Sequence, residues 1–125
     1  MIAGSYNITC EQGTSFSRII ALEQPRTPTE EDPSLYEVYS LVDHTARMQV
    51  RRTLESTGSP IISLTTENEK IELDGINGLI TLILSATDTA ALTSSGVYDL
   101  EIIDINGLVS RVIQGTFTLS LEVTR

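Results

Sequence analysis

Alternation of apolar and polar residues with a period of two is the feature that most constrains the fold of this chain. In residues 45–51, Ala46, Met48 and Val50 alternate with more polar side chains. A second run places four apolar residues in the same alternation: Phe117, Leu119, Leu121 and Val123. Successive side chains of a β-strand point to opposite faces, whereas a helix repeats its apolar face every 3.6 residues. The chain is therefore expected to form half-buried strands, with each of these sets facing a core.

Turn signals divide the alternation into short strands. Asn-Gly pairs at 77–78 and 106–107 accept the positive φ angles that tight hairpin turns require. Each pair is expected to join the strands on either side of it into a hairpin. The expected strands, in chain order, are 6–11, 15–22, 37–41, 45–51, 61–65, 70–73, 79–84, 96–103, 108–115 and 116–123.

The number and spacing of these strands predict an all-β fold. An antiparallel β-sandwich with immunoglobulin-like or related topology is the preferred architecture, and a small barrel is the alternative. The length of 125 residues corresponds to one domain, residues 1–125. The chain has no Trp and only 5% aromatic residues, so the core is expected to be aliphatic, with Tyr36, Tyr98 and Phe117 as its larger members.

Two segments depart from the alternation. In residues 85–92, Ser85 and Asp88 have the spacing of a helical capping box, which predicts one short helical turn. Residues 23–36 contain three of the four prolines and are rich in carboxylates, so we expect a long acidic loop that cannot pair in a sheet. This loop is either a tolerated insertion between strands or an arm that docks on a partner.

Charge and composition exclude several classes of function. The net charge of −9 argues against nucleic-acid binding, which needs an electropositive surface. No stretch approaches the roughly 20 apolar residues of a membrane helix, and no signal peptide is visible. Cys10 is the only cysteine, so we expect a buried apolar side chain rather than a disulfide or a reactive thiol.

Candidate catalytic and metal-binding residues do not combine into a site in the sequence. His44 is the only histidine and precedes a strand, so it is interpreted as a loop residue rather than a catalytic base. One His and one Cys cannot supply the four ligands of a structural zinc site. The adjacent carboxylates from Glu30 to Asp32 lack the alternating spacing of a calcium loop. We expect no catalytic residue, no metal and no cofactor.

Charged residues on the polar faces of strands are the candidates for an interaction surface. Asp99 and Glu101 alternate opposite Tyr98, and we expect them to face Arg47 and Arg51 across strands or across a subunit boundary. The acidic loop is a second candidate region. The candidate interface residues are therefore Arg47, Arg51, Asp99, Glu101, Glu30, Glu31 and Asp32.

Several stretches taken together resemble a known family. They are residues 43–51, 78–86 with 89–92, 96–101, 107–115 and 122–125, together with the opening stretches 4–8 and 11–16. In order and spacing they are similar to the small β-sandwich structural proteins encoded among the tail and baseplate genes of tailed bacteriophages. The acidic segment 23–36 departs from that pattern.

The resemblance implies a virion protein that folds in the host cytoplasm and packs, in several copies, against other virion structural proteins. It implies no enzymatic activity and no cofactor. Its station is expected to be the tail, the baseplate or a fibre adaptor, with capsid decoration as an alternative. A carbohydrate- or receptor-binding module is a further alternative, and it would need an exposed aromatic platform from the available tyrosines: Tyr6, Tyr36, Tyr39 and Tyr98.

Overall fold

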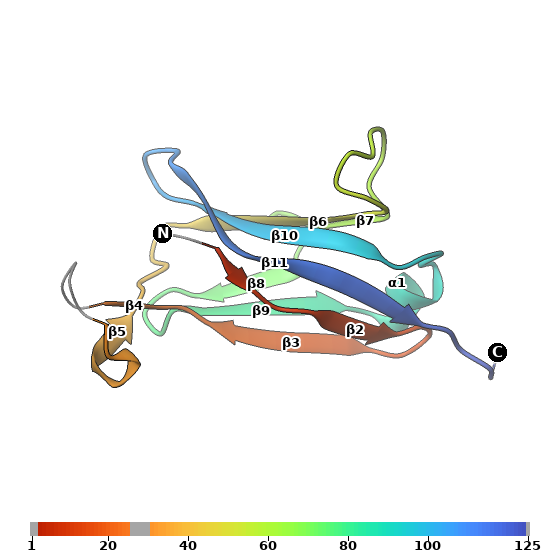
Figure 1. Cartoon of the computed structure of the whole chain (residues 1–125), viewed down its shortest axis with the longest axis horizontal. Coiled ribbons are helices and arrows are strands. Elements are labelled where there is room, and N and C mark those ends of the chain that lie inside the picture. Colours follow the sequence, from red (N-terminus) through yellow and green to blue (C-terminus); the bar gives the residue numbers. More distant parts are fainter. Residues whose placement is uncertain (1–2, 26–30, 125) are drawn as a thin grey trace.

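The computed structural model describes residues 3–25 and 31–124, and the chain is mostly β, as predicted (Figure 1). One α-helix and one 3-10 helix interrupt the strands of these residues. The elements are β1 (Gly4–Ser5), β2 (Ile8–Glu11), β3 (Phe16–Ala21), β4 (Glu23–Pro25), η1 (Pro33–Leu35), β5 (Tyr36–Val38), β6 (Thr45–Arg51), β7 (Ile62–Thr65), β8 (Ile71–Asp74), β9 (Leu79–Leu84), α1 (Ala86–Ala90), β10 (Gly96–Ile103) and β11 (Val109–Ser120).

The strands form two larger sheets and a small ribbon. One sheet has the order β1–β11–β10–β6–β7, with β2 also paired to β11, and the second has the order β3–β9–β8. Strands β4 and β5 form the ribbon. Most pairs are antiparallel, but β1 and β2 both run parallel to β11. The prediction of purely antiparallel sheets is therefore wrong at this edge, where the chain passes from one sheet to the other between β2 and β3.

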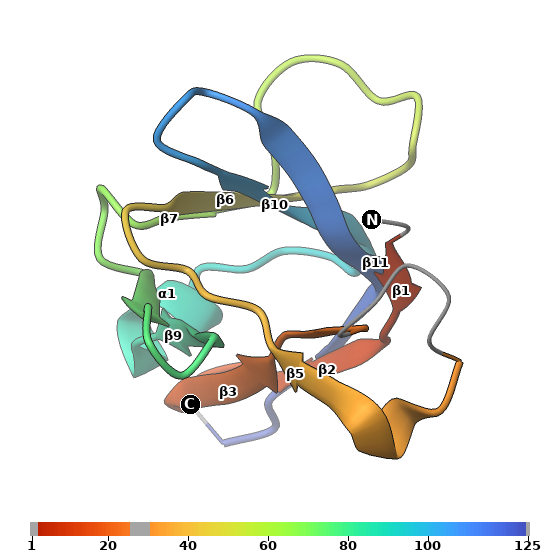
Figure 2. The ribbon, with the colours of Figure 1, turned by 90° about the vertical axis from the view of Figure 1, so that its left-hand side faces the viewer.

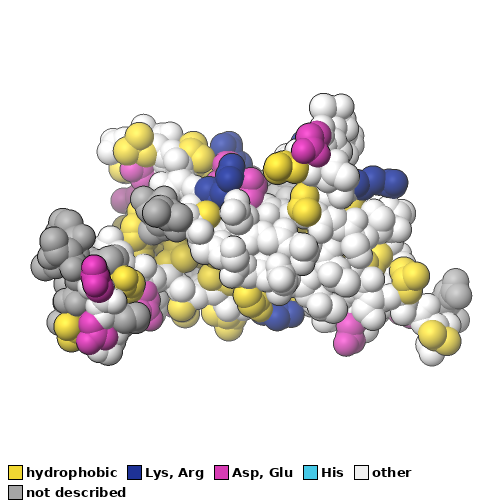
Figure 3. All heavy atoms as spheres, viewed as in Figure 1, with side chains coloured by type: hydrophobic (Ala, Val, Ile, Leu, Met, Phe, Trp, Pro, Cys, Tyr) yellow, Lys and Arg dark blue, Asp and Glu magenta, His cyan; other side chains and the backbone are white. Residues whose placement is uncertain are grey.

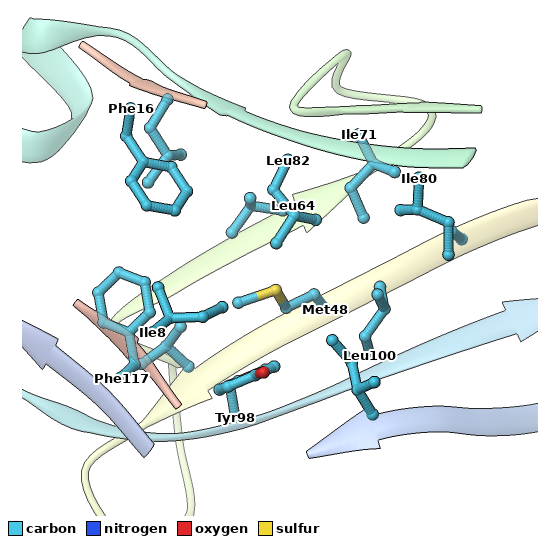
Figure 4. Close-up of a cluster of buried hydrophobic side chains, with 14 of the residues drawn as sticks. Ile8, Phe16, Met48, Leu64, Ile71, Ile80, Leu82, Tyr98, Leu100 and Phe117 are labelled. Atoms are coloured by element: carbon cyan, nitrogen blue, oxygen red, sulfur yellow. The ribbon is translucent and has the colours of Figure 1, made fainter. Parts of the chain in front are cut away.

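The core lies between the facing sides of the two larger sheets (Figure 4). Met48 and Leu100 extend toward it from the six-stranded sheet, and Leu82 from the three-stranded sheet. As predicted, the core is mostly aliphatic and includes Tyr98 and Phe117, which are 4% and 1% exposed. Tyr36 was predicted to belong to it but is only half-buried, because it lies in the peripheral ribbon.

Strand β11 is longer and less regular than expected. The predicted strands 108–115 and 116–123 are one continuous strand that ends at Ser120. A bulge inserts Val112, so that it and Ile113 are both buried, and the alternation changes phase there. The prediction that Leu121 and Val123 face the core is wrong: their side chains are 72% and 91% exposed. Strand β11 ends at Ser120, so both residues lie beyond the sheet.

The acidic segment 23–36 is not a simple loop. Its two ends pair as β4 and β5, so the expectation that it cannot join a sheet is wrong. Pro25 is tolerated because it is the last residue of β4 in a peripheral two-stranded ribbon, where the missing N–H group costs few hydrogen bonds. The Leu22 N–H donates to the Gly78 carbonyl and the Tyr39 N–H donates to the Leu22 carbonyl, which fixes the ribbon to the β8–β9 turn.

The two Asn-Gly turns form hairpins as predicted. Gly78 and Gly107 have φ angles of 63° and 84°, which favour glycine. In the second turn, an Asp104 carboxylate oxygen accepts from the N–H groups of Asn106 and Leu108 at 2.8 and 2.9 Å. The hairpins therefore connect β8 to β9 and β10 to β11 with a side chain fixing the second turn.

Helix α1 is the predicted helical turn, and its capping box is present. The Asp88 N–H donates to Ser85 Oγ, and the Ser85 N–H donates to the Asp88 carboxylate. The buried Thr89 hydroxyl donates to the Thr14 carbonyl at 2.7 Å, which attaches the helix to the β2–β3 turn. The hydrogen bond from Ser85 and the interaction with Lys70 hold the pKa of Asp88 below its usual value.

Candidate interaction surface

The outer face of the six-stranded sheet, on the side away from the core, brings four of the predicted interface residues together. Because Tyr98, Leu100 and Ile102 point into the core, their neighbours on β10 point outward. The antiparallel register places Glu101 directly opposite Arg47, and it places Asp99 opposite the residue between Arg47 and Arg51. The expected contact across strands is therefore observed within one chain for Arg47 and Glu101, whereas Arg51 pairs with neither Asp99 nor Glu101.

Ion pairs and hydrogen bonds order the charged side chains of this outer face. Arg47 Nε lies 2.8 Å from Glu101 Oε1, and Arg111 Nε lies 3.4 Å from Asp99 Oδ2. Arg51 donates to the Gly58 carbonyl and to Gln49 Oε1, at 2.8 and 2.9 Å. These contacts are partly exposed, so each pair contributes at most about 1 kcal/mol to stability. They chiefly fix the orientation of the groups that face solvent.

Arg111 is a member of this surface that the sequence did not reveal. It lies on β11, next to the bulge at Val112, and its guanidinium also donates to Gln114 Oε1 at 3.2 Å. The alternation Val109, Arg111, Ile113 would place an arginine on the core side of a regular strand. Only the bulge directs Arg111 outward, and the apolar–polar pattern of β11 does not indicate a bulge.

Two raised segments stand on this face. Residues 52–61, between β6 and β7, and the turn 104–108, between β10 and β11, both rise on the outer side of the sheet (Figures 1 and 2). A groove of about 680 Å³ lies on the same face, and the first of these segments lines it through Thr53 and Leu54. Basic and acidic side chains lie side by side in the hollow (Figure 3). Its lining is Ser5, Asn7, Gln49, Arg51, Thr53, Leu54, Val97, Tyr98, Asp99, Glu101, Arg111, Gln114, Gly115 and Thr116.

The floor of the groove is held where the N-terminal strands β1 and β2 run alongside β11. The Tyr98 hydroxyl donates to the Tyr6 carbonyl at 2.5 Å. Burial raises the pKa of Tyr98 to about 12, so the phenol stays protonated and keeps donating at neutral pH. Gly115 makes this close approach of the two chain segments possible, because a Cβ there would lie 2.2 Å from the Tyr6 oxygen. Asn7 Oδ1 accepts from the Thr116 N–H at 3.1 Å between the same two segments.

The remaining predicted interface residues lie in a different part of the molecule. Glu31 and Asp32 are exposed, just before η1 and the ribbon strand β5. The Ser34 hydroxyl and N–H donate to an Asp32 oxygen at 2.8 and 3.0 Å, and these bonds lower the pKa of Asp32. Glu30 lies outside the described residues. The structure therefore divides the described members of the predicted set between the outer face of the six-stranded sheet and the end of the molecule that carries the ribbon.

The other residues considered for chemistry have structural partners. His44 Nδ1 lies 2.9 Å from the Val42 carbonyl, and the imidazole meets the Tyr39 ring edge-on at 6.1 Å. Cys10 is fully buried, as expected, and burial raises the pKa of its thiol. Over residues 3–25 and 31–124, no three or more His, Cys, Asp and Glu side chains gather in a way that could hold a metal ion. In the same residues no helix has the length and hydrophobicity to cross a membrane.

No protein-family model and no curated protein matches this chain. The function proposed next therefore rests on the sequence pattern, on the resemblance described above and on the geometry of the outer groove.

Proposed function

We propose that this protein is a structural component of a tailed-phage virion, in the tail, the baseplate or a fibre adaptor, and that its outer groove packs against other virion proteins. The observation that carries the proposal is the ordered polar surface of that groove. Of its charged groups, Glu101 pairs with Arg47, Asp99 pairs with Arg111, and Arg51 donates to Gly58 and Gln49. A surface of oriented hydrogen-bonding groups around a few apolar side chains is typical of specific protein–protein contacts.

The strand order supports an immunoglobulin-like β-sandwich as the finer description of the fold. An immunoglobulin domain places its third, sixth and seventh strands in one sheet and its second, fourth and fifth in the other. The order β11–β10–β6–β7 against β3–β9–β8 fits a variable-type arrangement with one additional edge strand. Such a scaffold presents a fixed sheet face and two clusters of loops for assembly.

The groove suits a protein neighbour better than a sugar. Sugar-binding sites commonly stack a ring on an exposed aromatic side chain, and Tyr98 is the aromatic residue in this lining. Its ring is buried, with only 4% of the residue exposed. The two acidic groups that could resemble a glycosidase pair, Asp99 and Glu101, are each engaged by an arginine.

Gradient sedimentation and labelling test the proposal. The protein, carrying a small epitope tag, is produced in cells infected with a tailed phage that encodes it, and particles are purified by density. We expect the tag in the particle fraction, with antibody label at the tail or baseplate under the electron microscope. Label on the capsid shell would favour a decoration protein. Tag that stays entirely in the soluble fraction and binds a glycan array would refute the virion role and favour a binding module.

A further inference from the structure

Strand β3 leaves one edge of the three-stranded sheet open. It pairs with β9 on its other side, where the Leu22 N–H just beyond the end of β3 donates to the Gly78 carbonyl. Hydrogen-bonded pairs alternate along an antiparallel ladder, so the backbone groups of Ser17, Ile19 and Ala21 point away from β9. In the part of the chain that the structure describes, no backbone or side-chain group bonds to these N–H and C=O groups.

The side chains on this edge leave room for a neighbouring strand. Those of the three open residues are exposed and uncharged, and Ile19 is 64% exposed. Arg18 is the charged residue of β3, and it folds back on its own chain, where its guanidinium donates to the Tyr6 hydroxyl at 2.8 Å and lies 5.3 Å from the centre of the Phe16 ring. Strand β3 follows the lower margin of the molecule in Figure 1, and Figure 3 shows hydrophobic side chains along that margin. Monomeric proteins commonly protect such an edge with outward charges or proline, and β3 presents neither.

Two other sheet edges are covered by the chain itself. On β7, the side-chain amide of Asn68 takes the place of a neighbouring strand: its Oδ1 accepts from the Thr65 N–H at 2.9 Å, and its Nδ2 donates to the Ser63 carbonyl at 3.0 Å. Beside β8, the Leu41 N–H donates to the Gly75 carbonyl, so the segment before β6 runs along that edge. The edge of β3 has no comparable cover in the described residues.

We propose that β3 pairs with β3 of a second copy of this protein, as antiparallel strands about a two-fold axis. With the axis at Ile19, the open groups meet in register: Ile19 lies opposite Ile19 of the second copy, and Ser17 lies opposite Ala21 of the second copy. Each such pair exchanges two N–H···O=C hydrogen bonds, because all three residues point their backbone groups away from β9. The two three-stranded sheets then join into one continuous sheet with the order β8–β9–β3–β3–β9–β8. The contact is isologous, so association stops at a dimer.

A second copy fits this edge because the edge is complementary to itself. The open residues are spaced evenly on either side of Ile19, so the two-fold axis brings every free donor opposite a free acceptor. On the outer face the exposed Ile19 side chains form a cross-strand apolar pair. On the core side Arg18 lies beside Ile20 of the second copy, so no two like charges meet. This edge is separate from the outer groove, and the inference does not depend on the proposed function.

Sedimentation velocity over a wide concentration series tests the association, at physiological salt to screen the net charge of −9 on each copy. We expect wild type to form a species of twice the monomer mass of 13.7 kDa. Ile19→Lys should dimerise at least roughly tenfold more weakly, because two lysines would lie directly opposite each other. The matched control Ile105→Lys makes the same change at a residue that is 75% exposed in the β10–β11 turn, and it should dimerise like wild type. Circular dichroism verifies that both variants fold.

Cysteine cross-linking tests the register of the two strands. Residues opposite each other in a hydrogen-bonded pair have Cα atoms about 5.5 Å apart, a distance that a disulfide spans. Under mild oxidation, Ile19→Cys should therefore link to itself, and a mixture of Ser17→Cys with Ala21→Cys should link one variant to the other. Neither of these two variants should link alone, because its two new cysteines would lie four residues apart along the strands, about 14 Å. The native Cys10 is fully buried and does not compete.

Three results would overturn the proposal: wild type that stays monomeric throughout, a folded Ile19→Lys that dimerises as strongly as wild type, or Ser17→Cys and Ala21→Cys variants that each link alone as readily as in their mixture. A dimer that Ile19→Lys weakens, with the expected pattern of cross-links, would support it. If Ile19→Lys does not fold, the cross-links of the folded cysteine variants decide.

Discussion

Replacing Gly115 by Ala tests how the floor of the groove is built. The added Cβ would lie 2.2 Å from the Tyr6 oxygen and 2.8 Å from the Tyr6 carbonyl carbon. The Tyr6 carbonyl must then move by roughly 1 Å to reach an ordinary contact. That carbonyl accepts the Tyr98 hydroxyl, so the displacement also breaks or weakens the 2.5 Å hydrogen bond.

The expected loss of stability follows from these two effects. Overpacking against backbone costs about 1–3 kcal/mol, and the lost hydrogen bond costs about 1 kcal/mol. The Gly115→Ala variant should therefore be less stable by about 2–4 kcal/mol, a large part of the total for a domain of this size. Urea unfolding followed by circular dichroism measures the difference. Tyr98→Phe alone should cost about 1 kcal/mol.

Two comparisons separate the steric effect from a general effect of alanine. Gly58→Ala has the same change of side chain at a position with φ of 87° and no atom within 4 Å, so only backbone strain of about 1–2 kcal/mol is expected there. The double variant Gly115→Ala with Tyr98→Phe should be more stable than the sum of the single effects implies, because both act through the Tyr6 carbonyl. Effects that add to within about 0.5 kcal/mol would refute this coupling.

Further predictions concern ionisation, burial and surface charge. Burial raises the pKa of Tyr98 to about 12 from its ordinary value of 10.0, so the protonated phenol stabilises the fold fully below pH 10 and this contribution is lost between about pH 10 and 12. The stability advantage of wild type over Tyr98→Phe should therefore shrink between about pH 10 and 12. An unchanged advantage would contradict the assignment. Thr89→Val should cost about 1–3 kcal/mol in urea unfolding, because the Thr14 carbonyl loses its donor; a neutral effect would mean that water replaces it. The Cys10 thiol should react with a thiol reagent only as fast as the protein opens, so its rate should rise steeply with urea, whereas fast labelling without urea would show that the thiol is accessible. Arg47→Ala should change stability by less than about 1 kcal/mol, because its pair with Glu101 is partly exposed; a much larger loss would show that the pair supports the fold.

The parts of the fold that depend on residues close together in the sequence were predicted correctly. The alternation at Ala46, Met48 and Val50 correctly gave the buried face of β6, because a half-buried strand needs one apolar side. The spacing of Ser85 and Asp88 correctly gave the start of α1, because the two side chains cap each other's backbone. The same reasoning placed Arg47 and Glu101 on outward faces.

Features that depend on chain segments far apart in the sequence could not be predicted from local patterns. The alternation continues through Leu121 and Val123, but β11 ends at Ser120, so both residues lie beyond the sheet and are exposed. The pairing of residues 23–25 with 36–38 was not predicted, because proline is excluded from the central strands of a sheet but is tolerated at the edge of a ribbon. The outward position of Arg111 depends on a bulge that has no local signature.

The central claim is that the outer groove is an assembly surface of a virion component. The most direct measurement is the copy number of the protein in purified particles, by quantitative mass spectrometry, when a phage lacking its own copy of the gene is supplied with each variant. We expect wild type and Arg52→Glu to enter particles to the same extent, and Arg51→Glu to be reduced roughly tenfold or more. Equal incorporation of all three, or the absence of all three from particles, would contradict the claim.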